Sequence, residues 1–218
     1  MAVDLQNELL SLRRDLLALG ALVEHQVTRT VDAMFTSDVE IAREVKRADA
    51  DVDALDLKIE EDCMRLLALG SPMASDLRQI LSTLRISGGL ERIADLAKGI
   101  SKRTIKLANL DAITLPSAMV DMAQATKLMV SDALAALTNE DVEMCRGVRQ
   151  SDNLVDALNK EILVWSRSEI PRNIEITTAA IHILTIAQRL ERLADITTSI
   201  AEDVIYLVEG RIVRHGVE

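Results

Sequence analysis

Apolar residues recur along the chain at steps of three and four, the spacing that places side chains on one face of an α-helix. The first stripe joins Leu5, Leu9, Leu12, Leu16, Leu19 and Val23, and a second runs from Ile41 through Val45, Val52, Leu55 and Ile59 to Leu66. The same pattern returns in four later segments. It predicts six long helices, over residues 5–35, 38–69, 73–107, 117–137, 140–167 and about 173–209.

Short segments rich in capping or helix-breaking residues separate these helices. Residues 36–38 offer a serine and an aspartate as helix caps, and a Gly-Ser-Pro segment at 70–72 stops the second helix. The best linker covers residues 109–116. Because short connections favour antiparallel neighbours, the sequence predicts an all-α fold of two tandem antiparallel three-helix bundles, one over 1–110 and the other over 111–218.

The two halves also resemble each other in sequence. Residues 38–55 align with 141–158, and ten of these 18 positions are identical. Farther on, the hexapeptide 90–95 (LERIAD) returns at 190–195 as LERLAD. A duplicated three-helix unit explains both matches.

Composition narrows the class of protein. Half of the residues are apolar, yet there is one Trp, one Tyr and one Phe, so we expect a core of aliphatic side chains. A formal charge of −10 argues against nucleic acid and anionic lipid as partners, and leaves metals and basic proteins open. The chain does not open on a signal peptide pattern, and no apolar run approaches the roughly 18 residues of a membrane span. We expect a cytoplasmic protein without membrane insertion.

Each half carries two pairs of carboxylates spaced four residues apart, which places both members of a pair on one helix face. The pairs are Asp49 and Asp53, Glu91 and Asp95, Asp152 and Asp156, and Glu191 and Asp195. If the second and third helices of each half are neighbours, four carboxylates could converge there. The Glu and Asp of each hexapeptide lie off the apolar stripe, so such a site would sit near the surface, in a groove between helices.

Two interpretations of these carboxylates remain open. One is a solvated charged face, which is the usual role of such pairs. The other is an oxygen-rich site for Mg, Ca, Mn or iron. No ExxH motif is present, and the three histidines, His25, His182 and His215, are scattered singly.

Other chemistry is sparse. The sequence contains no phosphate-binding glycine loop and no nucleophile-elbow motif. Arg92 and Arg192 directly follow the repeated glutamates, and we expect them to form local ion pairs. Cys63 and Cys145 have no metal-binding spacing, and Cys63 follows an apolar stripe, as a small core residue would.

Three stretches of the chain resemble the PhoU family. They are PMASDLR at 72–78, the two hexapeptides, and AEDVIYLVEGR at 201–211 with VRH at 213–215. The resemblance covers essentially the whole chain. It implies two similar three-helix bundles, often dimeric, in a cytoplasmic accessory protein that restrains the phosphate-starvation response. Such a protein contacts the phosphate ABC transporter and its sensor histidine kinase.

The resemblance also implies multinuclear iron or zinc clusters on the bundle surface in some members. By position, the ligands would be Glu91, Asp95, Glu191 and Asp195, with Asp49, Asp53, Asp152 and Asp156 contributing from the neighbouring helices. The sequence departs from the family pattern in two ways. Gly99 and Ser199 stand where Asn is frequent, and Ile196 stands where His is frequent, so polar groups near these sites are missing.

The leading hypothesis is therefore a non-enzymatic negative regulator of phosphate uptake and signalling. A carboxylate-bridged metal enzyme or a metal-storage bundle is the alternative from another class. It is disfavoured because neither a nucleophile nor a histidine accompanies the carboxylates. The third hypothesis is a purely structural helical adaptor.

Overall fold

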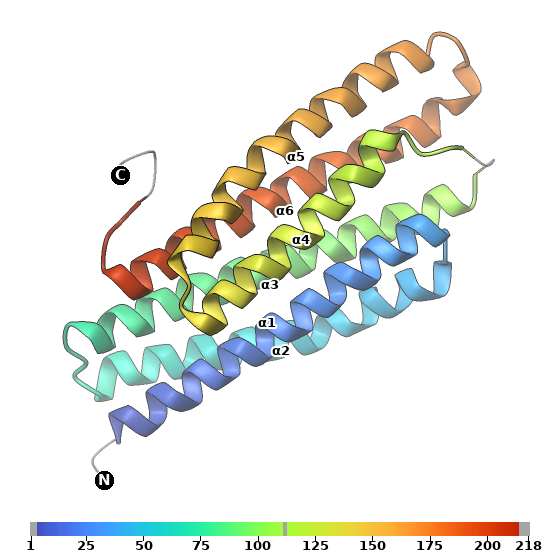
Figure 1. Cartoon of the computed structure of the whole chain (residues 1–218). Helices are drawn as coiled ribbons and strands as arrows, with labels where there is room; N and C mark the ends of the chain where they lie inside the picture. Colours follow the sequence, from blue (N-terminus) through green and yellow to red (C-terminus); the bar gives the residue numbers. More distant parts are fainter. Residues whose placement is uncertain (1–3, 111–112, 214–218) are drawn as a thin grey trace.

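A computed structural model of the protein describes residues 4–110 and 113–213. Within these ranges the chain forms six α-helices and one short 3-10 helix (Figure 1). They are α1 (Leu5–Thr36), α2 (Val39–Leu69), α3 (Ser75–Ala108), α4 (Ser117–Asn139), α5 (Val142–Glu169), η1 (Ile174–Ile176) and α6 (Thr177–Glu209). The predicted all-α fold is confirmed. The predicted boundary between 110 and 111 borders residues that are not described and stays a prediction.

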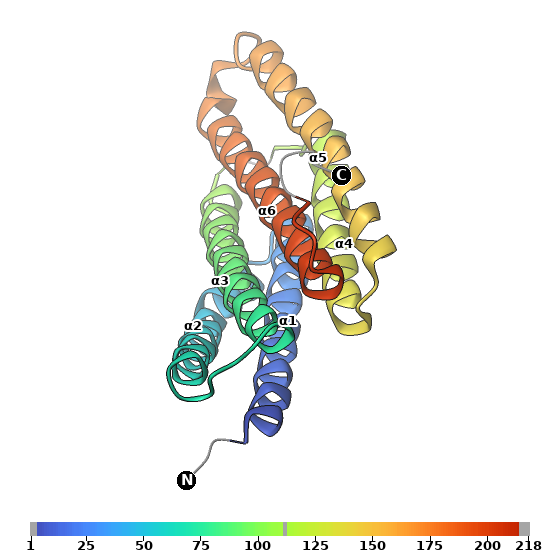
Figure 2. The same ribbon diagram turned by 90° about the vertical axis from the view of Figure 1, so that its left-hand side faces the viewer.

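The helices of each half pack side by side, and two contacts join the halves. In the first half α3 lies against α1 and α2, and in the second half α6 lies against α4 and α5. The halves meet where α3 packs along α6 and where α1 meets α4. Figure 2 shows α3 and α6 next to each other between the outer helices, and Figure 1 shows that they run in opposite directions. The α3–α6 pair is thus the seam of the molecule.

Equivalent residues of the two repeats start α2 and α5. The side chain of Asp38 accepts hydrogen bonds from the backbone N–H groups of Glu40 and Ile41, at 2.8 and 3.1 Å. Asp141, its counterpart, accepts from the N–H of Met144 at 3.0 Å. Such caps satisfy donors that the first helical turn leaves free. The preceding residue of each turn, Ser37 or Glu140, adopts a left-handed conformation, so the duplication preserved the turn as well as the helices.

The third and sixth helices begin later than predicted, for local reasons. Ala74 has φ 46° and ψ −104°, which no α-helix accommodates, so α3 begins at Ser75 rather than near residue 73. The side chain of Asn173 accepts a hydrogen bond from the N–H of Glu175 at 3.1 Å and caps η1. The regular helix α6 then begins at Thr177, four residues after the predicted start.

The core is aliphatic, as the composition indicates. Leu90 and Ile93 of α3 and Leu190 and Leu193 of α6 are each at most 1% exposed. Cys63 is fully buried, and burial raises the pKa of its thiol to about 12. A thiol with so high a pKa is not a nucleophile at neutral pH, so the expected structural role is confirmed. No helix of the described part is both long and apolar enough to cross a lipid bilayer.

Candidate functional site

The first two carboxylate pairs come together between α2 and α3. The pKa of Glu91 is raised by burial and then by the charges of Asp95 and, across from it on α2, Asp56 and Asp53. The pKa of Asp53 is likewise raised by burial, then by Asp49. The charges of carboxylates on α2 therefore act on a carboxyl group of α3. This is what we expect if the carboxylate pairs of the two helices lie close together. Asp56 is an additional member that the spacing argument missed.

A lysine lies within this first cluster. Lys98 of α3 donates hydrogen bonds to Asp49 and, at 3.4 Å, to Asp95. The hydrogen bond to Asp49 is the largest cause of the raised pKa of the Lys98 ammonium group. Asp49 itself is 4% exposed. A cation bound at Asp49 and Asp95 would have to displace Lys98, so the first cluster is a poor fit to a metal ion.

The second cluster, between α5 and α6, has no lysine. Burial raises the pKa of Asp152 to about 6, with further contributions from Asp195, Asp156 and Glu191. The residue equivalent to Lys98 is Thr198, whose buried hydroxyl has no hydrogen-bond partner among the described residues. Four carboxylates are therefore close together here without a paired ammonium group.

Neither cluster has the geometry that a metal ion needs. In residues 4–110 and 113–213, no three Asp, Glu, His or Cys side chains are arranged so that they could share one ion. Oxygen donors are present in the second cluster, but they do not point to a common centre. His25 is exposed, and His182 faces Arg103 at 3.4 Å, outside the clusters. His215 lies outside the described residues. Metal binding at the eight carboxylates stays a prediction.

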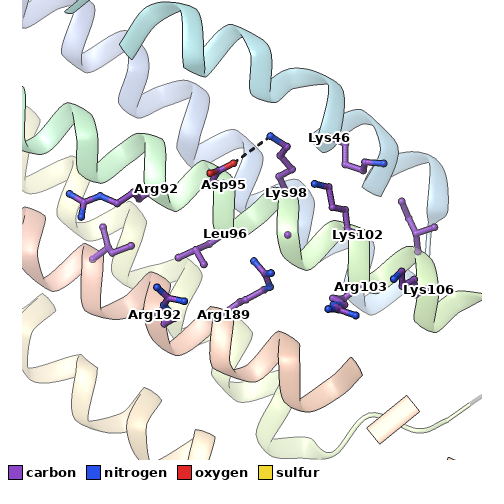
Figure 3. A pocket seen from close by; sticks show the side chains of 13 residues that line it. Lys46, Arg92, Asp95, Leu96, Lys98, Lys102, Arg103, Lys106, Arg189 and Arg192 are labelled. Carbon is purple, nitrogen blue, oxygen red and sulfur yellow. Dashed lines mark hydrogen bonds and ion pairs between the residues drawn. The ribbon is translucent and has the colours of Figure 1, made fainter. Parts of the chain in front are cut away.

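The expected local attraction of Arg92 and Arg192 to the neighbouring glutamates is present, since their charges act to lower the pKa values of Glu91 and Glu191. Neither guanidinium group forms a direct ion pair with a described residue, and Nε of Arg92 donates to the carbonyl oxygen of Gly88 at 2.8 Å. Both side chains instead line a groove of about 670 Å³ along α3 and α6 (Figure 3). The sequence argument missed this groove, because its residues come from three helices and the overall charge is negative.

Burial of Asp152, together with the charges of the neighbouring carboxylates, predicts a pH-dependent stability. A carboxyl whose folded pKa is about 6 rather than 3.8 contributes stability below pH 3.8, and this contribution is lost as pH rises through 6. Asp152→Asn is therefore expected to raise the free energy of unfolding at pH 8 by about 1 kcal/mol, after allowance for solvent screening, and to have little effect at pH 4. Urea unfolding at both pH values measures this. Asp51→Asn, at an exposed position of α2, is the control. A stability loss at pH 8 would contradict the prediction.

Comparison with known proteins agrees with this architecture. The model of the PhoU domain matches twice, at residues 16–104 and 119–204. A phosphate-specific transport system accessory protein PhoU homolog from Xylella fastidiosa is 34% identical over 208 residues, covering 94% of this chain and 86% of that protein. The homolog from Pseudomonas aeruginosa is 36% identical over 214 residues, covering 95% of this chain and 86% of that protein.

Solved structures agree as well. The crystal structure of PhoU from Pseudomonas aeruginosa superposes with a TM-score of 0.91 at 33% identity, covering 94% of this chain and 99% of that chain. The phosphate transport system regulatory protein PhoU from Streptococcus pneumoniae gives a TM-score of 0.84 at 28% identity, covering 96% and 99%. These matches cover nearly the full length of the chain, and they therefore include both halves and the six helices. The chain belongs to the PhoU family.

Proposed function

We propose that this protein is a cytoplasmic negative regulator of the phosphate-starvation response and a modulator of phosphate uptake. The observation that carries the proposal is the extent of the similarity, since relatives named as accessory proteins of the phosphate-specific transport system match over 94–95% of the chain. The proposed partners are the ATPase of the phosphate ABC transporter and its sensor histidine kinase. The protein acts on them by docking its long helical faces, as a homodimer.

The chemistry of the described residues supports a binding role over a catalytic one. Cys63 and Cys145 are buried, with pKa values raised to about 12 and about 11. His182 faces the guanidinium group of Arg103, and the pKa of His182 is lowered by burial and by this charge. A nucleophile beside a general base, which a hydrolytic site needs, does not occur among these groups.

Affinity capture from cell extract tests the proposed partners. The full-length protein, carrying an affinity tag, is expected to retain the transporter ATPase and the sensor kinase from phosphate-replete cells. Less of both is expected from phosphate-starved cells. An unrelated helical protein with the same tag is the control. Capture of neither protein under either condition would contradict docking as the mechanism.

A surface metal ion is the second part of the proposal, and the second cluster is the better candidate. Burial and neighbouring carboxylates raise the pKa values of Asp152, Glu191 and Asp195. No described lysine pairs with them, whereas Lys98 pairs with Asp49 in the first cluster. Iron or zinc is the expected ion, with Mg or Mn as alternatives of the same oxygen-ligand chemistry. When bound, the ion would supply positive charge that lets these side chains converge and sets the shape of a docking surface.

Elemental analysis of protein purified without chelator tests the metal. Glu191→Ala is expected to lower the metal content more than Glu91→Ala, because Lys98 competes with an ion only in the first half. Circular dichroism controls for folding. Equal metal content in both variants and in the unaltered protein would contradict the proposed ligands.

A further inference from the structure

The groove along the α3–α6 seam concentrates positive charge on a protein of net charge −10. Its α3 wall carries Arg92, Lys98, Lys102, Arg103 and Lys106. Arg189 and Arg192 of α6 face them, and Lys46 of α2 adds an eighth cation. The lining includes one carboxylate, that of Asp95. Figure 3 shows these side chains gathered around the space between α3 and α6.

Most of these cationic side chains form no ion pair with a described residue, although the charge of Arg92 acts on Glu91 and that of Arg192 acts on Glu191 and Asp195. Of the eight cationic side chains, Lys98 alone forms ion pairs with described residues, to Asp49 and Asp95. Elsewhere the protein pairs many of its cations, as in Arg65 with Glu8 and Asp62. Like charges held together without partners repel one another, which lowers stability unless an anion offsets them. The groove therefore has the electrostatics of an anion site.

The absence of a side chain at Gly99 leaves space for Arg189 in this groove. An added Cβ at Gly99 would lie 2.1 Å from Nη1 and 2.7 Å from Cζ of Arg189. The guanidinium group thus lies directly on the backbone of α3, where any side chain at position 99 would displace it. The Nε atom of Arg189 is buried and has no hydrogen-bond partner among the described residues. Gly99, a departure from the family pattern, is what makes room for this arginine.

The other end of the seam shows that the charge is specific to this groove. The antiparallel packing of α3 on α6 gives it two pseudo-equivalent hollows, because Gly89 meets Ile200 much as Gly99 meets Arg189. The counterparts of Lys102 and Arg103 at an offset of 100 are Glu202 and Asp203 in the second hollow. These duplicated positions thus carry opposite charges. The second hollow balances Glu202 and Asp203 with Arg85 and Arg92, whereas the first has eight cationic side chains and one carboxylate, so the excess of positive charge lies in the first.

We propose that this groove binds a linear, multiply charged phosphate anion, such as tripolyphosphate or a longer inorganic polyphosphate. Lys98, Lys102 and Lys106 recur once per helical turn and span about 12 Å along α3, which suits a row of negative groups. The guanidinium group of arginine and the ammonium group of lysine are the usual protein ligands of phosphate oxygens. The volume of about 670 Å³ lies in the range of ligand pockets.

Two other classes of ligand fit less well. None of the described residues that line the groove is aromatic, so a nucleobase would find no stacking partner. A nucleotide is therefore expected to bind through its phosphates alone. An acidic peptide would offer fewer charges per unit length than a chain of phosphates. The binding inference is independent of the proposed regulatory role, since it concerns the purified protein.

Isothermal titration of the full-length protein with tripolyphosphate tests the proposal. Lys102→Ala combined with Lys106→Ala is expected to weaken binding at least tenfold. The matched control is Lys160→Ala with Arg167→Ala, which removes two exposed cations of α5 outside the groove and is expected to change affinity less than twofold. Affinity should rise from orthophosphate to tripolyphosphate, ATP should bind no more tightly than tripolyphosphate, and binding should weaken with added salt.

Gly99→Asn gives a second, independent readout. The added side chain is expected to displace Arg189 and weaken tripolyphosphate binding at least threefold, while the melting temperature of the protein stays close to that of the unaltered chain. The proposal is overturned if tripolyphosphate does not bind, or if the α5 control loses as much affinity as the groove variant. Poly-glutamate that binds as tightly as tripolyphosphate would also overturn it, in favour of an acidic protein partner.

Discussion

Leu90→Ala is expected to lower the free energy of unfolding by about 3 kcal/mol, the typical cost of a leucine truncation in a close-packed core. Leu90 is fully buried on α3, the helix that packs against α1 and α2 and also along α6. The cavity would therefore open in the buried core, on the helix that contacts both halves. Surrounding helices of this length cannot close such a cavity without shifting along their neighbours, so most of the cost should remain.

Urea unfolding followed by circular dichroism measures this loss. The control is Leu57→Ala on α2, where the side chain is 56% exposed and truncation should cost less than about 0.5 kcal/mol. Leu190→Ala, at the same place in the second repeat and 1% exposed, should resemble Leu90→Ala. A loss below about 1 kcal/mol at Leu90 would show that α3 is not the packed centre of the fold.

Asp49→Asn is expected to destabilise the protein by about 2 kcal/mol. Asp49 is 4% exposed and accepts a hydrogen bond from the ammonium group of Lys98, so the neutral amide would leave a lysine half-buried without its main partner. Breaking a fully buried pair typically costs about 3–5 kcal/mol, and the 28% exposure of the Lys98 side chain reduces that figure.

The equivalent substitution in the second repeat has the opposite expected sign. Asp152→Asn removes a charge that burial and the neighbouring carboxylates disfavour, so it should stabilise the protein at pH 8, whereas Asp49→Asn should destabilise it at the same pH. Denaturant unfolding of both variants measures the contrast, and Asp49→Asn combined with Lys98→Met isolates the pairwise energy. If both single variants change stability in the same direction, Lys98 does not distinguish the two clusters.

The helices were largely predictable because their signals are local. Apolar periodicity, the capping aspartates at 38 and 141 and the Gly-Ser-Pro break lie within a few residues of the features that they determine. The start of α6 was missed because Asn173 instead caps a 3-10 turn. That choice depends on a single hydrogen bond that no periodicity reveals.

The candidate sites were predictable only in part, because side-chain partners depend on how helices face one another. Spacing indicated that the carboxylate pairs of neighbouring helices meet, and their pKa shifts agree with this. Spacing could not show that Lys98 reaches Asp49 from another helix, or that Arg192 faces the groove. The recurrence of Lys98, Lys102 and Lys106 every four residues was a usable signal, and it was hidden by the acidic composition.

Duplication followed by divergence accounts for these differences between the halves. The two repeats keep the capping aspartates 38 and 141, the left-handed turn residue before each, and the buried leucines 90 and 190. They differ along the hollows between α3 and α6, as in Lys98 and its counterpart Thr198, or Gly99 and Ser199. The residues that form the fold are thus similar in the two repeats, whereas residues along the α3–α6 hollows differ. We expect functions that depend on a partner to rely on the positions that differ.

The proposed restraint of the phosphate-starvation response is tested most directly by a reporter fused to a phosphate-regulon promoter, measured in phosphate-replete cells with and without the gene. Deletion is expected to raise reporter expression to the level of starved cells, and a plasmid copy of the gene should return it to baseline. Reporter expression that stays at baseline after deletion would contradict the claim.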